Sequence, residues 1–373
     1  MKVKSVLKKE GITIVKQLDT LQVNVIAKSI SDRLCLTFPE HNINQSDVFS
    51  AICRLNMYVA DMGIDLAGAK YFSKNNSIYF NKDVDFGKLS DVAIHECIHV
   101  VQEIKDENDN LVCMGLYDTS SGLGINEATV QLMTAEVNSL KMVQEKYFDI
   151  SLNTVSPDYY PLECALVKQL AYFTGTYPLY HSTLYSNDVF KNTLIAKSDK
   201  KTYHTIIKNL DKLLDTENEL HYFIHELQDA EIQNTREMIN RLIVKRKSTI
   251  ISLFFKTQNL IIKKLFSNEF NSIRNLQDVK DFKVKFYKFK NLIGSSDAYT
   301  FYNDSYINMM DLLEQKREYI ETYGEINLFA NAENHLMIID EAQNIFSLLM
   351  TLFKKTKKLF NKAPKIIDIN EWD

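Results

Sequence analysis

Apolar residues recur at spacings of three and four through most of the second half of the chain, which is the periodicity of an amphipathic helix. No glycine lies between Gly175 and Gly294, and no proline lies between Pro178 and Pro364, so residues that end helices are almost missing there. The heptads are too irregular to indicate a coiled coil. Residues 191–373 are therefore predicted to form a helical bundle or arm. Its helices are expected over residues 210–227, 232–266, 309–323 and 332–360.

The first half mixes strand and helix patterns. Residues 69–81 contain two short runs of aromatic and β-branched residues separated by Asn75 and Asn76, which predicts a hairpin. Uncharged residues fill most of 92–101 and predict a buried helix, and residues 162–173 predict another helix that ends before the next glycine. The predicted fold class is α+β, predominantly α-helical, with a small sheet.

The buried helix carries the most informative motif of the chain. Its sequence, Val-Ala-Ile-His-Glu-Cys-Ile-His-Val-Val, contains His95-Glu96-x-x-His99. Positions four apart share one helix face, so the imidazoles of His95 and His99 can reach the same Zn²⁺. Glu96 is rotated by about 100° from His95, which puts its carboxylate beside the metal, where it can take a proton from water. The structural alternative is a core helix with backbone-bonded histidines and a salt-bridged glutamate.

A catalytic zinc usually has three protein ligands, so a third ligand is required. Residues 122–131, Gly-Leu-Gly-Ile-Asn-Glu-Ala-Thr-Val-Gln, predict a loop that leads into a second helix capped near Asn126, with Glu127 in its first turn. The chain between His99 and Glu127 is long enough for this helix to return beside the first. Glu127 is the expected third ligand.

Three other carboxylates compete for that role. Glu103 is expected on the histidine helix but too far along its axis, and Glu136 would face away from the metal unless the second helix starts later than expected. Asp118 is the strongest rival. A metzincin is excluded because Gln102 and Lys105 stand where that family needs glycine and histidine.

Over residues 70–140 the chain resembles the gluzincins, zinc metallopeptidases in which a second helix supplies a glutamate ligand, often within Asn-Glu-Ala. The resemblance implies Zn²⁺ on His95, His99 and Glu127, with Glu96 as general base. One position departs from the pattern: Gln131 stands where many gluzincins have an aspartate that orients a ligand histidine, and it can accept the same hydrogen bond without charge. The expected organisation is a helical lead-in (1–40), a zincin-like domain (41–190) and the helical C-terminal part (191–373).

Two further parts of an active site are expected from this resemblance. In zincins an edge strand of the sheet pairs with an extended substrate, and residues 77–81 are the candidate, although a hairpin that only covers the core fits equally well. A tyrosine or histidine usually stabilises the oxyanion. The sequence leaves six candidates open: Tyr159, Tyr160, Tyr172, Tyr177, Tyr180 and His181.

Charge and cysteine content limit the partners and the compartment. The formal net charge of −4 gives no reason to expect a nucleic-acid partner. Five cysteines without a Cys-x-x-Cys pair suit free thiols in a reducing compartment. No secretory hydrophobic core and no apolar run of about 18 residues is present. A cytoplasmic protein is expected.

Two apolar runs with basic flanks, at residues 250–255 and 345–353, raise the possibility of contact with a membrane surface, although bundle core explains such runs more simply. His221 and His225 are also four apart, but Tyr222 stands between them where the zinc motif has glutamate, so both are expected on the surface.

The function predicted from the sequence is zinc-dependent hydrolysis of peptide bonds in a peptide or protein substrate. Zinc would polarise the scissile carbonyl, while Glu96 takes the proton of the attacking water and passes it to the leaving amine. The alternative is a catalytically inactive zincin-like protein that binds a partner through its helical C-terminal half.

Overall fold

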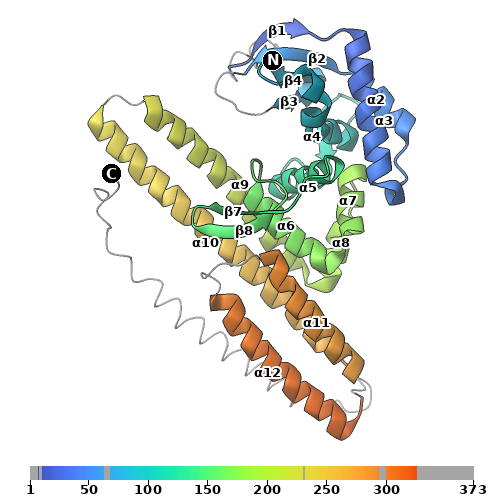
Figure 1. The fold of residues 1–373 in the computed structure, drawn as a ribbon, viewed down its shortest axis with the longest axis vertical. Helices are drawn as coiled ribbons and strands as arrows, with labels where there is room; N and C mark the ends of the chain where they lie inside the picture. Colours follow the sequence, from blue (N-terminus) through green and yellow to red (C-terminus); the bar gives the residue numbers. More distant parts are fainter. Residues whose placement is uncertain (1–6, 8–10, 63–67, 230–231, 294–299, 326–373) are drawn as a thin grey trace. The chain divides into compact units, whose positions relative to one another are not determined.

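The computed structural model describes residues 7, 11–62, 68–229, 232–293 and 300–325 (Figure 1). It has the predicted α+β composition, mostly helical with small sheets. Contacts divide the chain into two compact units, one of residues 1–272 and 282–311 and the other of residues 273–281 and 312–373. The first unit contains every described strand and the candidate site. The predicted helix at 332–360, which includes the apolar run 345–353, lies outside the described residues.

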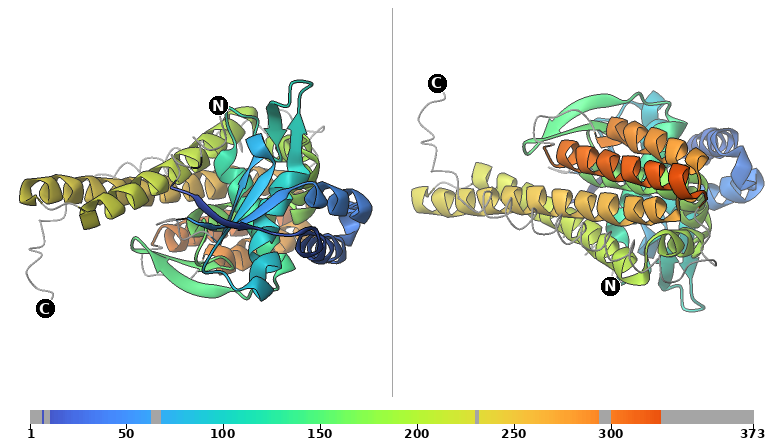
Figure 2. Two further views of the ribbon diagram at one scale, coloured as in Figure 1. Left: turned by 90° about the horizontal axis from the view of Figure 1, so that it is seen from above. Right: turned by 90° about the horizontal axis from the view of Figure 1, so that it is seen from below.

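Four strands form the main sheet in the order β1-β2-β4-β3 (Figure 2, left). They are β1 (Thr13–Gln17), β2 (Asn56–Asp61), β3 (Ala69–Phe72) and β4 (Ser77–Asn81). β2 and β4 are parallel, while the other pairs are antiparallel. Strands β3 and β4 form the predicted hairpin, and Asn76 turns the chain with a φ of 50°, a left-handed conformation that asparagine tolerates.

Two expectations about this sheet were wrong. Residues 77–81 do not form an edge strand, because β4 lies between β2 and β3 and its side chains from Ser77 to Phe80 are buried, as in an interior strand. The edge strand next to the helix that carries His95 and His99 is β3. The first 40 residues are not purely helical, because β1 precedes helix α2 (Thr20–Thr37) and pairs with β2.

Besides α2, six α-helices lie along the described part of the chain between β1 and residue 197. They are α3 (Gln45–Cys53), α4 (Leu89–Gln102), α5 (Leu123–Val137), α6 (Pro161–Thr174), α7 (Thr176–Tyr185) and α8 (Val189–Lys197). Helix α4 packs against β3 and β4 on one side and against α5 on the other. Two small hairpins complete this part: β5 (Glu103–Lys105) with β6 (Leu111–Met114), and β7 (Val143–Tyr147) with β8 (Ile150–Thr154).

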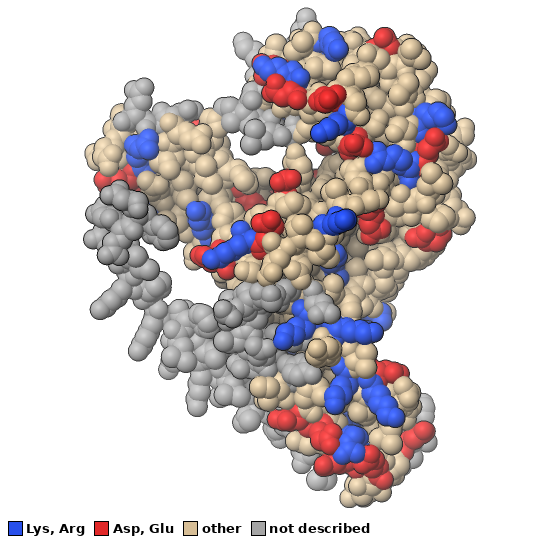
Figure 3. Space-filling view, in the orientation of Figure 1, with Lys and Arg blue, Asp and Glu red and all other residues tan. Residues whose placement is uncertain are grey.

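The predicted long helices at 210–227, 232–266 and 309–323 are confirmed. The structure has α9 (Lys200–Asp229), α10 (Gln233–Ser272), α11 (Leu276–Ile293) and α12 (Thr300–Tyr323). In the apolar run 250–255, Ile250 and Phe254 are fully buried, so this run is bundle core. Within the described residues, no helix is long and apolar enough to cross a membrane. Acidic and basic side chains are interspersed over the upper part of the face in Figure 3.

The start of α5 is held by a residue from α9. The carboxylate of Asp211 accepts hydrogen bonds from the backbone N–H groups of Gly122 and Gly124, each at 2.9 Å. A Cβ on Gly124 would lie 2.5 Å from the carbonyl oxygen of Leu210, so only glycine allows α9 to approach this closely. The helix therefore begins at Leu123, and the expected cap near Asn126 was wrong. Glu127 lies in the second turn of α5.

Candidate metal centre

Helix α4 presents the two histidines of the motif from its middle. The predicted buried helix is confirmed, since Ile94, Cys97 and Ile98 are fully buried. Their contacts fix the rotation of the helix about its axis. The rings of His95 and His99 consequently lie one turn apart on the same face, with centroids separated by 4.8 Å.

Glu127 of α5 faces both imidazoles. Its carboxylate oxygens lie 3.2 Å from Nε2 of His95 and 3.5 Å from Nε2 of His99, and the two Nε2 atoms are 3.1 Å apart. For tetrahedral zinc with bonds of about 2.0–2.1 Å, neighbouring ligand atoms are about 3.3 Å apart. The three groups therefore fit three corners of a zinc tetrahedron and leave the fourth corner open.

Two glutamine side chains orient the histidines. Nδ1 of His95 lies 3.0 Å from Oε1 of Gln131, and Nδ1 of His99 lies 3.1 Å from Oε1 of Gln102. A carboxamide oxygen only accepts, so each Nδ1 carries a hydrogen and each Nε2 is the nitrogen that faces Glu127. Gln102 was not predicted as part of the site, although its position three residues after His99 puts it on the same helix face. Two Nε2 atoms and a carboxylate that converge in this way favour a cation between them, either a proton or a metal ion.

The pKa values of Glu127 and His99 also indicate that this group of side chains favours a cation. Burial raises the pKa of Glu127, but the nearby His99 and His95 outweigh burial and hold this pKa far below its usual range. Burial lowers the pKa of His99, but the Glu127 carboxylate and the remaining neighbours raise it to about 9. The site thus stabilises positive charge beside Glu127, and a metal cation would compete with protons for the same atoms.

Glu96 lies beside this group and is not part of it. Its Oε2 accepts a hydrogen bond of 2.8 Å from the backbone N–H of Tyr71 in strand β3. Among the described residues, the cluster of ligand atoms within 4.8 Å of one another consists of His95, His99 and Glu127. The carboxylate of Glu96 is therefore held between the metal-binding helix and the edge of the sheet.

The structure places the three rival carboxylates elsewhere. Glu103 is not on the histidine helix as expected, because α4 ends at Gln102 and Glu103 begins β5. Its carboxylate pairs with Lys105 at 3.0 Å. Asp118 accepts hydrogen bonds from the backbone N–H groups of its own loop. Glu136 accepts the hydroxyl of Tyr180 at 2.5 Å.

Of the six candidates for oxyanion stabilisation, Tyr160 lies beside the proposed metal ligand His95. Its ring centroid is 6.0 Å from that of His95. Burial raises its pKa strongly, and the carboxylates of Glu127 and Glu96 raise it further. Tyr160 has a φ of 50°, a conformation that costs a non-glycine residue about 1–2 kcal/mol and that is often found at functional sites. Pro161 follows it as the first residue of α6.

A pair of buried carboxyl groups lies behind Tyr160. Glu163 of α6 is fully buried and Glu217 of α9 is 8% exposed. Each carboxyl group affects the pKa of the other, and neither carboxyl oxygen of Glu163 has a hydrogen-bond partner among the described residues. Burial raises the pKa of Glu163 to about 7 and raises that of Glu217 well above its ordinary value. Two buried carboxyl groups that affect each other do not both ionise readily, so the pair retains a proton at neutral pH.

This pair predicts that stability falls as the pH rises. Both pKa values are raised in the folded state, so the folded protein binds more protons than the unfolded chain from about pH 4.5 upward through about pH 7, and the free energy of unfolding decreases over that window. Glu217→Gln removes one of the two buried carboxyl groups and replaces it with a neutral carboxamide. It is expected to raise the free energy of unfolding at pH 8 by about 1–3 kcal/mol and to flatten its pH dependence.

Urea unfolding of both proteins at pH 5 and pH 8 measures this effect. Glu237→Gln, which changes an exposed glutamate of α10, is the matched control and is expected to leave the pH dependence unchanged. A Glu217→Gln protein that is less stable than the parent at pH 8 would contradict the shared-proton description.

No protein-family model, curated protein or solved structure matches this chain. The resemblance to gluzincins therefore rests on the motif residues and on the geometry described above. Both the zincin-like assignment and the domain boundaries at residues 40 and 190 stay predictions.

Proposed function

We propose that this chain is a zinc-dependent peptidase. The observation that carries the proposal is the geometry of His95, His99 and Glu127, whose ligand atoms are separated by 3.1–3.5 Å while both histidines donate Nδ1–H to a glutamine. Two nitrogen ligands, one carboxylate and an open fourth position are the arrangement of catalytic rather than structural zinc sites.

Zinc held by these residues would supply Lewis acidity, which polarises a scissile carbonyl and lowers the pKa of a coordinated water. Glu96 accepts the proton of the attacking water and then donates it to the leaving amine. The N–H of Tyr71 keeps the Glu96 carboxylate in place for both transfers. Tyr160, whose raised pKa keeps its hydroxyl protonated, donates a hydrogen bond to the developing oxyanion.

An extended peptide would bind along strand β3. This strand is the last in the sheet order, and the Tyr71 N–H on its outer edge donates to Glu96, the residue after the proposed ligand His95. Addition of a substrate strand there supplies backbone hydrogen bonds and brings a peptide carbonyl close to the zinc ligands.

The second candidate function is a metal-binding interaction module without turnover. It is favoured by one observation: both orienting partners of the histidines, Gln102 and Gln131, are neutral carboxamides, which increase the basicity of the ligands less than carboxylates do.

All five cysteines are free thiols, as expected for a reducing compartment. The cytoplasmic location, the lack of a nucleic-acid partner and the lack of membrane contact stay predictions.

A zinc-dependence assay distinguishes the two functions. Zinc-loaded full-length protein is incubated with a denatured protein mixture, and new peptide termini are identified by mass spectrometry. Cleavage is expected with zinc, is expected to stop after removal of the metal with a chelator, and is expected to return when zinc is added back. One zinc per chain without any cleavage would favour the interaction module.

A further inference from the structure

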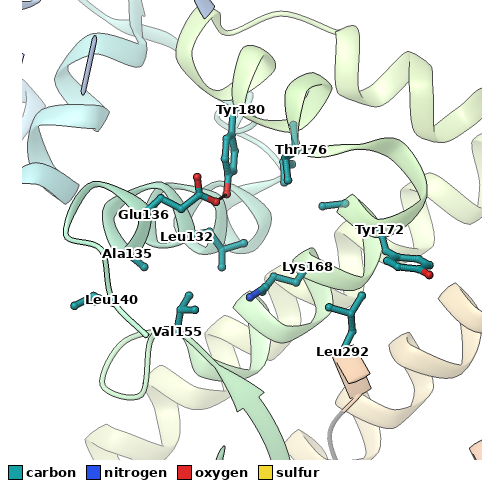
Figure 4. A pocket seen from close by; sticks show the side chains of 12 residues that line it. Leu132, Ala135, Glu136, Leu140, Val155, Lys168, Tyr172, Thr176, Tyr180 and Leu292 are labelled. Carbon is teal, nitrogen blue, oxygen red and sulfur yellow. Dashed lines mark hydrogen bonds between the residues drawn. The ribbon is translucent and has the colours of Figure 1, made fainter. Parts of the chain in front are cut away.

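A cavity of about 250 Å³ lies on the side of α5 opposite the metal centre (Figure 4). Glu136, which lines it, follows Glu127 by nine positions and is therefore half a turn around the helix. The cavity is bounded by α5, α6, α7, the segment before and after β7–β8, and one residue of α11. Its lining is mainly apolar and includes Leu132, Ala135, Val155, Ala171, Leu179 and Leu292.

Two charged side chains of opposite sign line this cavity without forming an ion pair. Lys168 of α6 is half-buried, and its Nζ has the Sδ atom of Met142 at 3.9 Å as its hydrogen-bonding neighbour. In the part of the chain that the structure describes, no carboxylate lies within 4 Å of this ammonium group. Burial lowers the pKa of Lys168, whereas the more distant Glu136 raises it. A half-buried cation beside an apolar cavity is stabilised by an anion that enters it.

Glu136 supplies the complementary charge at the exposed rim. Its Oε1 accepts the hydroxyl of Tyr180, while among the described residues no donor is bonded to Oε2, which can accept another one (Figure 4). The close-up shows the Glu136 and Lys168 side chains extending from two different helices toward the same space. The cavity thus combines an anion-binding group, a cation-binding group and an apolar interior.

We propose that this cavity binds a free α-amino acid with an apolar side chain. The ligand carboxylate pairs with Lys168, its ammonium group pairs with Glu136, and its side chain fills the apolar interior. At about 30 Å³ for each water-sized group, the cavity holds about eight such groups, which matches leucine or methionine. This site does not depend on the metal centre or on the proposed peptidase activity.

Calorimetric titration of the zinc-loaded full-length protein with leucine tests the proposal. Titration to about 20 mM covers the dissociation constant on the order of 1 mM that a ligand of this size typically shows. Leucinamide lacks the carboxylate, N-acetylleucine lacks the ammonium group and alanine lacks the apolar bulk, so each is expected to bind at least about tenfold more weakly. Octanoate has an anion and an apolar chain but no ammonium group. If octanoate binds as tightly as leucine, or if leucine does not bind, the amino-acid site is wrong.

Three variants identify the site. Lys168→Met preserves the length of the side chain, Glu136→Gln preserves the acceptor for Tyr180, and Ala171→Leu fills the cavity without changing a charge. Each is expected to weaken leucine binding at least about tenfold. Lys191→Met removes a lysine of α8 that pairs with Asp188, and it is expected to leave leucine binding unchanged.

Zinc content and thermal unfolding of each variant confirm that it is folded. Unchanged leucine affinity in a folded Lys168→Met protein would overturn the assignment. If Ala171→Leu does not fold, the two charge variants still decide the question, because neither changes the volume of the core appreciably.

Discussion

Glu96→Gln is expected to reduce peptide turnover by about 10²–10⁴-fold, equivalent to about 3–5 kcal/mol of activation barrier, while zinc stays bound. The glutamine retains an oxygen that accepts the Tyr71 N–H, so the hydrogen bond between α4 and β3 is kept. It cannot accept a proton from water. The change therefore removes the general base and leaves the positions of the three metal ligands intact.

The measurement is kcat on a peptide that the parent protein cleaves, together with the zinc content of both proteins. Glu103→Gln is the matched control, because Glu103 directly follows the same helix as the first residue of β5 and pairs with Lys105. Its turnover is expected to remain close to that of the parent. Loss of zinc from Glu96→Gln would make Glu96 a ligand, and full activity in this variant would exclude the proposed mechanism.

Substitution of any one metal ligand by alanine is expected to weaken zinc binding by more than about 10²-fold. His95→Ala, His99→Ala and Glu127→Ala each leave two protein ligands, which bind zinc far more weakly than three. Gln131→Ala and Gln102→Ala remove only the orienting hydrogen bonds and are expected to cost about 10–100-fold.

Competition with a fluorescent zinc chelator measures these affinities. His221→Ala changes an exposed histidine of α9 and serves as the control for loss of a histidine. If Glu127→Ala retains the affinity of the parent, the third ligand must be another carboxylate. If both single-histidine variants retain it, zinc binds elsewhere.

The local parts of the centre could be predicted from the sequence. The apolar residues around His95 and His99 place both on a buried helix, and helix geometry alone puts their rings on one face. The spacing to Glu127 allows a second helix to return beside the first. The structure brings these three residues together.

Parts that depend on distant residues could not be predicted. Asp211, which lies 89 residues after Gly122, sets the start of α5, and no local cap pattern shows this. Strand β4 is interior because β2 joins it from an earlier part of the chain, an arrangement that alternation of residues cannot reveal. Tyr160 could not be selected from six candidates, because its position depends on a left-handed backbone conformation before Pro161 and on packing between helices.

Anomalous diffraction at the zinc absorption edge, from crystals grown with stoichiometric zinc, tests the central claim most directly. A single strong peak is expected between Nε2 of His95, Nε2 of His99 and the Glu127 carboxylate, at about 2.0–2.2 Å from each ligand atom. A zinc peak on other residues, with none between these three side chains, would contradict the proposed metal centre and the peptidase mechanism that depends on it.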